Sequence, residues 1–578
     1  MQVYINRIGS ILLLFLIFTA GCRKIDIENF SPSDPNLSFA TETIEVSNEA
    51  LEYDIEVKSN LPWRVKSDAA WLSFVTENGN GDGSFKIGVS RNRTTETRTA
   101  EIVAWVTDGY QKVFTITQQA GEAPPDFTQH FYVKVDGSVN ADGLSWGNAT
   151  TLDNALDIAN SGDFVHIAAG TYKPGMAITN GVSTDEKDFT FEIKTNLTLI
   201  GGYSANAQGS EQANPQVNQT ILSGNLGANK ARHVVTVSAI MEADKKVSIS
   251  GMTIKEGQAG GGGSGSIAIE GTNYSRQHGG GMIIGKANVL IDNCQIIENS
   301  TTNHAAGMYI TNNAVVTIKN SSISKNTATV AASNGGGIWN DGSTIYMYNT
   351  TVDGNRVGGI GAGIYALNTA RVSYTFMYNV TISNNVVGIF GDSRAAAGYY
   401  GRERSEGVMV NCTVAGNVAQ SNGAGISMYG GSKLDIISST VTGNLSATAS
   451  GIHNNGNNTI NIHNSIISGN SSEEQTGGTA ISKRASTIIG GTAYDEEGGV
   501  IVGASFDAST MIGTLANNGG LTKTILLTGT NNPAMQYGMT VLQLQLLAIN
   551  DNLEESIITS DQTGKDRSGK TTMGAVVN

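Results

Sequence analysis

The chain has 578 residues, which is more than one compact domain usually contains, so several units or a long repeat are expected. Only 15% of the residues are charged, and 71 are glycine against 8 proline, which excludes collagen and a disordered proline-rich chain. The formal net charge is −14 and no basic patch is present, which argues against a nucleic-acid-binding protein.

The first segment has the features of an export signal. Arg7 precedes an apolar run at 11–18 that is too short to span a bilayer as a mature helix. Residues 19–22 (TAGC) then resemble a lipobox, in which cleavage exposes a cysteine that receives lipid. The resemblance implies a signal peptide at 1–21 and lipid on Cys22 as the one membrane attachment. An ordinary secretory signal with an incidental cysteine is the alternative.

This lipobox-like segment also predicts where the protein resides. A polar stalk at 22–36 follows Cys22, and no second apolar run of spanning length occurs in the sequence. We therefore expect an outer-membrane lipoprotein that is exposed at the cell surface.

Residues 37–121 carry the pattern of a β-sandwich. Polar and apolar residues alternate, as in half-buried strands, in short runs separated by turn residues: 43–46, 53–57, 85–89, 100–106 and 113–119. Several segments resemble the BACON domain of Bacteroidetes: 61–65 (LPWRV), 71–73 (WLS), 98–100 (RTA) and 116–121 (ITQQAG). The resemblance implies an Ig-like fold that binds carbohydrate or mucin, or that serves as a spacer. Trp63 and Trp71 could stack on sugars, although core packing suits them better. A stiff linker at 122–129 follows.

A repeat decides the fold of residues 130–578. The motif Asn-x-x-(Ile/Val)-x-x-Asn recurs, and its last asparagines step by 27, 29, 30, 32, 27 and 26 residues: Asn299, Asn326, Asn355, Asn385, Asn417, Asn444 and Asn470. A second element, a glycine before an apolar residue, keeps the same period: Gly281, Gly307, Gly337, Gly363, Gly398, Gly425 and Gly451.

Each period is predicted to form one coil of short strands. A single coil cannot bury its apolar side, but coils stacked about 4.8 Å apart bury a continuous core. The aliphatic residue of each motif should then point inward in one column: Ile296, Ile323, Val352, Ile382, Val414, Val441 and Ile467. Asparagines should occupy the bends, where they tolerate a left-handed backbone. Alternation with a period of two excludes an α-solenoid, and the repeat is too short for a β-propeller.

The repeat resembles right-handed parallel β-helices of the pectate-lyase-like group, and also polymorphic outer-membrane protein repeats. Segments 131–137 (FYVKVDG), 142–146 (DGLSW) and 518–522 (NGGLT) resemble the ends of choice-of-anchor Q proteins. These resemblances imply an all-β chain. An N-terminal Ig-like β-sandwich is followed, at 130–578, by a right-handed parallel β-helix that ends in a C-terminal cap. Residues 535–537 (MQY) depart from that family's usual Ile-Asp-x, which places the form of the cap in doubt.

The cysteines and histidines do not indicate a metal site. Cys294 and Cys412 hold the same repeat position four coils apart, roughly 19 Å at the strand spacing. A disulfide needs Cα atoms within about 7 Å, so two free, inward-facing thiols are expected. His453 and His463 have outward parity and are interpreted as surface residues. No metal and no cofactor is predicted.

Catalysis is considered because the resembled fold hosts polysaccharide lyases and glycoside hydrolases. Paired aspartates for acid–base chemistry are missing from the sequence, and no Gly-His-Gly occurs. A lyase would need clustered carboxylates for Ca²⁺ and a basic residue, and the middle coils offer only these: Asp353, Arg356, Asp392, Arg394 and Arg402. Solvated loop charge explains them better, so no catalytic residue is predicted.

Outward aromatic residues are the candidate binding site. Four consecutive coils place one after the core residue of the glycine element, and the next strand adds four more: Tyr309, Trp339, Tyr365, Tyr400, then Tyr346, Tyr348, Phe376 and Tyr378. Aromatic faces stack on sugars and anchor protein contacts. They also stabilise sheets by stacking on each other, which is an equal alternative.

The sequence therefore predicts a non-catalytic surface lipoprotein for carbohydrate binding or adhesion. Its binding stripe would be centred near Trp339, framed by insertions at 260–278 and 386–397. The partner would be a polysaccharide, a host glycan or a surface protein, and not a nucleic acid. A polysaccharide lyase or glycoside hydrolase is the first alternative, and a structural spacer is the second.

Overall fold

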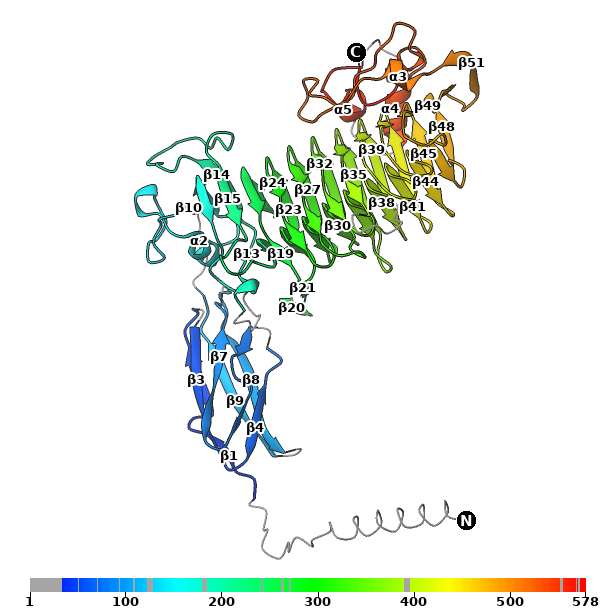
Figure 1. Ribbon diagram of the computed structural model, residues 1–578. Helices are drawn as coiled ribbons and strands as arrows, with labels where there is room; N and C mark the ends of the chain where they lie inside the picture. The colour runs from blue at the N-terminus through cyan, green and yellow to red at the C-terminus, as the bar shows by residue number, and fades with distance from the viewer. Residues whose placement is uncertain are drawn as a thin grey trace, which may run out of the picture. The chain divides into compact units, whose positions relative to one another are not determined.

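The computed structural model describes residues 34–578 except 50, 70, 93, 108–109, 122–127, 179–184, 240, 243, 261–264, 270–271, 389–395, 551–554, 568, 570–571 and 578. The chain divides after residue 122 into two compact units, each described here by itself (Figure 1). The predicted signal peptide, Cys22, most of the stalk and most of the linker lie outside the described residues. No helix in the described part of the chain has both the length and the apolar character needed to cross a membrane.

The N-terminal unit is a β-sandwich of two sheets. The four-stranded sheet has the order β1 (Leu37–Phe39), β3 (Leu51–Ser59), β7 (Gly83–Val89) and β5 (Leu72–Phe74). The five-stranded sheet has the order β2 (Thr43–Val46), β9 (Tyr110–Gln118), β8 (Arg98–Thr107), β4 (Pro62–Lys66) and β6 (Asn78–Asn80). Pairing is antiparallel except between β2 and β9, which run parallel.

Two of the three tryptophans of the sandwich, Trp63 and Trp71, belong to its packing, as preferred from the sequence. Trp63 is buried, contacts Phe85 with ring centroids 6.2 Å apart, and donates from Nε1 to the Gly81 carbonyl oxygen at 2.9 Å. Trp71 is partly buried, and the guanidinium of Arg98 lies over its ring at 4.6 Å. Trp63 is therefore a core residue, and Arg98 covers one face of Trp71.

The second unit is a parallel β-helix, whose coils stack in chain order (Figure 1). Its first sheet contains β10 (His130–Val133), β11 (Phe164–Ala168), β14 (Thr198–Tyr203), β17 (Val247–Ser250), β23 (Asn288–Asp292), β27 (Val315–Lys319), β31 (Thr344–Tyr348), β35 (Ser373–Tyr378), β39 (Ser405–Val410), β42 (Lys433–Ile437), β45 (Thr459–His463) and β48 (Lys483–Ala485).

The second sheet contains β12 (Gly170–Tyr172), β15 (Thr220–Ser223), β18 (Met252–Lys255), β24 (Gln295–Ile297), β28 (Ser322–Ser324), β32 (Thr351–Asp353), β36 (Thr381–Ser383), β40 (Thr413–Ala415), β43 (Thr440–Thr442), β46 (Ile466–Ile467), β49 (Thr487–Ile489), β50 (Thr492–Tyr494) and β51 (Val500–Ser505). Its strands are parallel up to β49, and the last two are antiparallel additions.

The third sheet contains β13 (Phe191–Ile193), β16 (Val235–Val237), β22 (Met282–Gly285), β26 (Met308–Thr311), β30 (Ile338–Asp341), β34 (Ile364–Leu367), β38 (Tyr399–Arg402), β41 (Ile426–Tyr429), β44 (Ile452–Asn455) and β47 (Thr476–Gly478). A short fourth sheet contains β19 (Gln258–Ala259), β25 (Ser300–Thr301), β29 (Thr327–Ala328), β33 (Arg356–Val357) and β37 (Val386–Val387). A separate hairpin is formed by β20 (Ser266–Ile269) and β21 (Thr272–Ser275).

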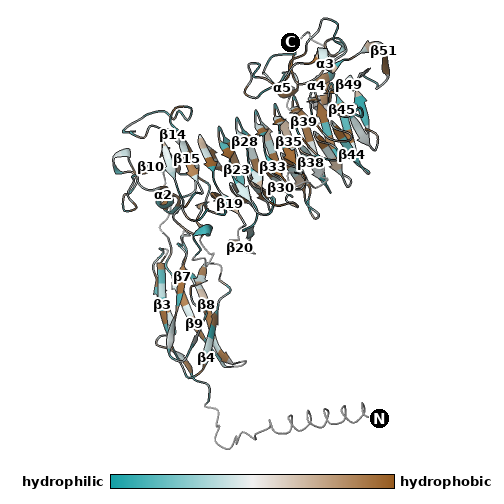
Figure 2. Cartoon of the chain, in the orientation of Figure 1, coloured by the Kyte–Doolittle hydropathy of each residue, from teal (hydrophilic) through white to brown (hydrophobic). Residues whose placement is uncertain are grey.

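The predicted inward column is confirmed. Ile296, Ile323 and Val352 pair in register on successive strands of the second sheet and are fully buried. Hydrophobic stretches recur from coil to coil along the β-helix in Figure 2. The repeated glycines are explained by close backbone approach. A Cβ on Gly337 would lie 2.6 Å from the carbonyl oxygen of Gly363, one coil further on.

The two cysteines are free and buried, as predicted. The Cys294 thiol lies 3.3 Å from the Asp292 carbonyl oxygen, and burial raises the pKa of both thiols to about 12. They are packing residues of the core and are not poised as nucleophiles.

Short helices lie beside the coils at both ends: η2 (Trp146–Asn148), α2 (Leu152–Ile158), η3 (Glu186–Asp188), α3 (Ala508–Met511), η4 (Pro533–Met535), α4 (Val541–Asn550) and α5 (Glu555–Ile558). α2 begins at the Thr151 N-cap and buries Leu152 and Leu156 in the core of the first coils. At the other end, α4 and α5 pack on the outer face of the first sheet. We call residues 516–577 the C-terminal cap.

Candidate functional site

An aromatic column runs along the outer face of the third sheet. Tyr309, Trp339, Tyr365 and Tyr400 occupy corresponding positions on β26, β30, β34 and β38, paired in register as predicted. Their ring centroids are separated by 5.1, 5.5 and 5.5 Å in that order. Tyr429 and His453 extend the same stack by further steps of 5.2 and 5.7 Å. The column is therefore continuous over the middle coils.

The rings of this column differ in how much surface they expose. Tyr309, Tyr365 and Tyr400 are 8%, 4% and 4% exposed, because neighbouring rings cover their faces. Trp339 keeps a partly exposed side chain. Burial raises the pKa of Tyr365 to about 12, so its hydroxyl stays a neutral hydrogen-bond donor at ordinary pH. Mutual stacking that stabilises the sheet accounts for the three tyrosines, and among the four predicted rings of this column Trp339 is the one that stays partly exposed.

Polar and imidazole groups surround Trp339. The rings of His278 and His304 lie 5.0 and 5.3 Å from it. Asp341, two residues along β30, accepts hydrogen bonds from the Tyr309 hydroxyl at 2.6 Å and the Asn368 amide at 2.7 Å. Planar carboxylate and amide groups beside an indole suit a ligand with an apolar face and hydroxyl edges.

The β20–β21 hairpin covers the N-terminal end of the aromatic column. Its side chains Ile267, Ile269 and Tyr274 pack in one cluster with Ile283 and Tyr309. This insertion was predicted to frame the stripe, and the described part of it does lie over the stripe's first coils. Parts of both insertions, namely 261–264, 270–271 and 389–395, lie outside the described residues.

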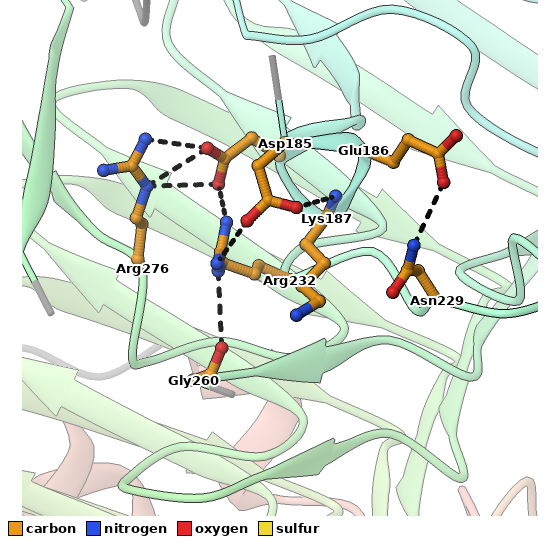
Figure 3. Close-up of polar contacts among 8 residues, drawn as sticks. Asp185, Glu186, Lys187, Asn229, Arg232, Gly260 and Arg276 are labelled. Atoms are coloured by element: carbon orange, nitrogen blue, oxygen red, sulfur yellow. Dashed lines mark hydrogen bonds and ion pairs between the residues drawn. The ribbon is translucent and has the colours of Figure 1, made fainter. Parts of the chain in front are cut away.

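A buried charge network holds the hairpin's ends. The guanidinium of Arg232 donates to Asp188 at 2.5 Å, to Asp185 at 2.8 Å and to the Gly260 carbonyl oxygen at 3.3 Å. Arg276, just after β21, donates to Asp188 at 2.7 Å. Figure 3 shows Arg232 and Arg276 side by side, with Arg232 in contact with Asp185 and Gly260. Removing one partner would leave an uncompensated buried charge, so the hairpin is firmly anchored.

The second predicted set of rings lies on the outer face of the first sheet and is partly covered. Tyr348 and Tyr378 stack at 5.0 Å and belong to one cluster with Met539, Leu544 and Ile558 of the C-terminal cap. The expectation that they face solvent is therefore corrected, because the cap docks on them.

The outer edge of the same sheet remains more open. Tyr346 is partly exposed and stacks on Phe376 at 5.0 Å, and Tyr374 beside them is 36% exposed. The predicted Tyr346 thus stays accessible at the cap's margin, next to an exposed ring that the sequence reasoning did not single out.

The two histidines predicted at the surface need correction. Both have the expected outward parity, but His463 is only 5% exposed and His453 is half-buried. His463 follows Val410 and Ile437 in register on the first sheet, under the C-terminal cap. Burial lowers its pKa to about 4. Alternation along the strand correctly predicted that the His463 side chain points outward. Its exposure depends on the C-terminal cap, which is far away in the sequence but covers it in space.

The charged residues considered for a lyase centre do not gather. Asp353 lies on β32 of the second sheet, Arg356 on β33 of the fourth and Arg402 on β38 of the third. Asp353 accepts from Ser383 and Asn384, and Arg402 pairs with Glu403 at 2.8 Å. Asp392 and Arg394 fall outside the described residues. Within the described part of the chain, no group of three or more His, Cys, Asp or Glu is arranged to hold a metal ion.

The sequence reasoning missed a ring cluster on the first coils. His130 and Tyr132 of β10 meet Phe164 and His166 of β11 on the outer face of the first sheet, with centroids 4.9 to 6.2 Å apart. Alternation within 130–133 and 164–168 was a usable signal for them, but these coils precede the asparagine motif that drew attention to the middle of the chain.

A pocket lies beside this cluster. Its volume is about 600 Å³, and it is lined by Trp146 with Lys134, Asp136, Asn148 and Gln208 among others. Trp146 is buried beneath it and contacts Tyr132 at 4.8 Å. The volume is in the range of small-molecule sites, although the pocket is open to solvent.

Comparison with known proteins identifies part of the chain. Residues 61–119 match the family described as "BACON: Putative binding domain, N-terminal", so a BACON domain lies within the sandwich. This confirms the sequence-based identification of that unit. No curated relative matches the chain.

Three solved structures show distant similarity. Pectate lyase Pel9A is 14% identical, with 72% of this chain and 92% of that chain covered and a TM-score of 0.42. A rhamnogalacturonan lyase is 12% identical, with 62% and 86% covered and a TM-score of 0.29. A Bacteroides ovatus GH5 xyloglucanase in complex with a heptasaccharide is 16% identical, with 30% and 46% covered and a TM-score of 0.15. This chain thus spans under half of the xyloglucanase, and scores this low support no inference about activity.

Proposed function

We propose that this chain is a lipid-anchored surface protein whose β-helix binds glycans without cleaving them, with Trp339 as the central contact. The observation that supports binding is the arrangement at β30, where one partly exposed indole stands between the buried rings of Tyr309 and Tyr365. The BACON domain, by its family description a binding domain, is consistent with an adhesive role for the whole chain.

The chemistry around Trp339 favours a carbohydrate over an apolar ligand. Pyranose C–H faces pack against an aromatic ring, and adjacent hydroxyls bond to planar carboxylate and amide groups. Asp341 and Asn368 supply such groups beside the indole, and Asp341 remains partly exposed while it accepts from Tyr309, Thr311 and Asn368. The ring is held by its neighbours, so little side-chain entropy would be lost on binding.

The decisive experiment compares glycan binding by the mature wild-type chain with that of Trp339→Ala and Trp339→Phe. Loss of binding in the alanine variant and partial retention in the phenylalanine variant are expected. The matched control is Trp105→Ala, which removes a partly exposed tryptophan of the sandwich. If Trp339→Ala binds like wild type while its circular dichroism is unchanged, the column is a structural stack and the proposal fails.

The non-catalytic part is tested by incubating the chain with acidic and neutral polysaccharides. No new unsaturated ends and no new reducing ends are expected. The appearance of unsaturated ends would replace the binding proposal with a lyase.

Anchoring is tested separately through Cys22, which lies outside the described residues. A Cys22→Ser variant should lose lipid labelling and partition out of the detergent phase. Protease added to intact cells should digest the wild-type chain if it faces outward. Unchanged partitioning of the variant would exclude lipid on Cys22.

A further inference from the structure

Two imidazoles meet at the open outer face of the first coils. His130 lies on β10 and His166 on β11, which are parallel and pair so that Tyr132 stands opposite His166 and His130 opposite Phe164. The histidines are diagonal neighbours, and Nδ1 of His130 lies 2.8 Å from Nε2 of His166. His130 is exposed to solvent, and His166 is partly buried behind it.

Stacked rings on the same face hold both imidazoles in place. His130 lies parallel to Phe164 at 4.9 Å with an interplanar angle of 9°, and His166 lies against Tyr132 at 5.1 Å with an angle of 19°. The two imidazoles are themselves 5.1 Å apart between centroids and within 10° of parallel. These contacts limit the rotamers of the partly buried His166 more than those of the exposed His130.

The hydrogen bonds of His166 determine which lone pair is available. Its Nδ1 lies 2.8 Å from the Tyr203 hydroxyl oxygen. When Nδ1–H donates to Tyr203, the lone pair on Nε2 points at His130. Metal-ligating histidines characteristically donate their second N–H to such a partner.

We propose that His130 and His166 form a binding site for a divalent late transition metal, with Zn²⁺ and Cu²⁺ as the fitting ions. The metal would be held by Nδ1 of His130 and Nε2 of His166, and Tyr203 would orient the His166 ring. The one proton between the two nitrogens moves to the exposed Nε2 of His130, which is an internal tautomer change, so no proton is released.

The geometry needs the exposed His130 ring to move, because the two imidazoles now lie edge to edge and must tilt to face one ion. Two Zn–N bonds of 2.0–2.1 Å at a tetrahedral angle place the nitrogens about 3.3 Å apart, so the present separation of 2.8 Å must widen slightly. The exposed His130 ring can make that movement. The described residues contain no larger metal-ligand group, so water completes the coordination sphere and the ion exchanges freely.

A second histidine pair in the same β-helix serves as an internal comparison. His278 and His304 also occupy successive coils, with ring centroids 5.3 Å apart. There, however, Nδ1 of His304 accepts a hydrogen bond from the Asn334 N–H at 3.0 Å, and Trp339 packs against both rings. Imidazole neighbours alone therefore do not make a site, and this pair is not expected to bind the metal.

The test is calorimetric titration of the mature, untagged chain with Zn²⁺ and with Cu²⁺. One equivalent should bind, Cu²⁺ more tightly than Zn²⁺, as imidazole sites generally prefer. His130→Ala should abolish this binding, His304→Ala should leave it unchanged, and Tyr203→Phe should weaken it about tenfold or more. Electron paramagnetic resonance of the Cu²⁺ form should show coupling to two imidazole nitrogens.

His130 is exposed, so its alanine variant should fold normally, which circular dichroism checks. Two results would overturn the site. One is a titration without a stoichiometric equivalent, and the other is His130→Ala binding the metal as wild type does. Loss of binding in His304→Ala alone would assign the metal to the other pair and equally reject this proposal.

Discussion

Two columns of asparagines run along the β-helix, and they perform different tasks. The inner column joins each side-chain amide to the next, with Nδ2–Oδ1 distances from 2.8 to 3.1 Å: Asn299, Asn326, Asn355, Asn385, Asn417, Asn444 and Asn470. All of these side chains are buried. The outer column instead occupies left-handed backbone positions, with φ from 46° to 57°: Asn293, Asn320, Asn349, Asn379, Asn411, Ser438 and Asn464.

The comparison shows that burial, and not residue type, determines how much an asparagine contributes to the stability of the β-helix. Asn355 accepts from both the backbone and side-chain N–H of Asn326 and donates to the Ile323 carbonyl oxygen, all at 3.0 Å. Asn349 in the same coil makes side-chain bonds to Asn320 and Asn379 at 3.2 and 3.1 Å but stays partly exposed. Water can replace those bonds, whereas nothing replaces the buried ones.

The largest effect is expected for Asn355→Ala. It leaves two buried N–H groups of Asn326 and the Ile323 carbonyl oxygen without partners, at roughly 1–3 kcal/mol each, so a loss of about 4 kcal/mol is expected. Denaturant unfolding would measure it. A loss below that of Asn349→Ala would contradict the distinction between the columns.

The next effect is a dependence of stability on pH, which comes from a histidine beside the outer column where the C-terminal cap covers it. His463, one residue before Asn464, has its pKa lowered by burial from 6.5 to about 4. The unfolded chain therefore binds a proton as pH falls below 6.5, while the folded chain does not until about pH 4. The contribution of His463 to the free energy of unfolding is fully present above about pH 6.5. It is lost as pH falls from 6.5 to about 4, by about 3 kcal/mol in all.

His463→Leu should remove that part of the pH dependence. Unfolding midpoints of wild type and variant, measured between pH 4 and 7, should differ in slope in that window. Equal slopes would show that His463 titrates normally and is not enclosed by the cap.

A smaller effect is expected at Asn411, where the C-terminal cap covers the outer column. The Asn411 amide donates to the Ile557 and Ser560 carbonyl oxygens of the cap and accepts from the buried Arg567. Asn411→Gly keeps the left-handed backbone and loses only these bonds, so about 2 kcal/mol is expected. Limited proteolysis should cleave the cap faster in this variant than in the wild type. An unchanged pattern would show that the Asn411 bonds do not hold the cap in place.

The smallest effect is expected at Asn349, where the outer column is not covered by the cap. Asn349 has φ 47°, so Asn349→Ala should cost about 1 kcal/mol from backbone strain, while Asn349→Gly should change little. The pair of variants is compared by thermal unfolding. If glycine is as harmful as alanine, the side-chain ladder and not the backbone explains the residue.

Much of the candidate site was predictable because it follows from local alternation. The outward direction of Trp339 and of Tyr365 came from counting residues after the glycine element, and both do lie in one column. The burial of Tyr365 was not predictable, since it depends on how rings of neighbouring coils tilt onto each other. The pairing of His130 with His166 likewise needs the register of two strands 34 residues apart.

The sequence by itself determined the coil, because spacing along the chain becomes position around and along one axis once strands stack. It thereby set the inward column at Ile323, the bends at Asn349 and the separation of the two thiols. Only the tertiary structure decided which outward side chains stay accessible. The cap at Leu544 covers Tyr378 and His463 through contacts between segments far apart in the chain, and no local pattern records that meeting.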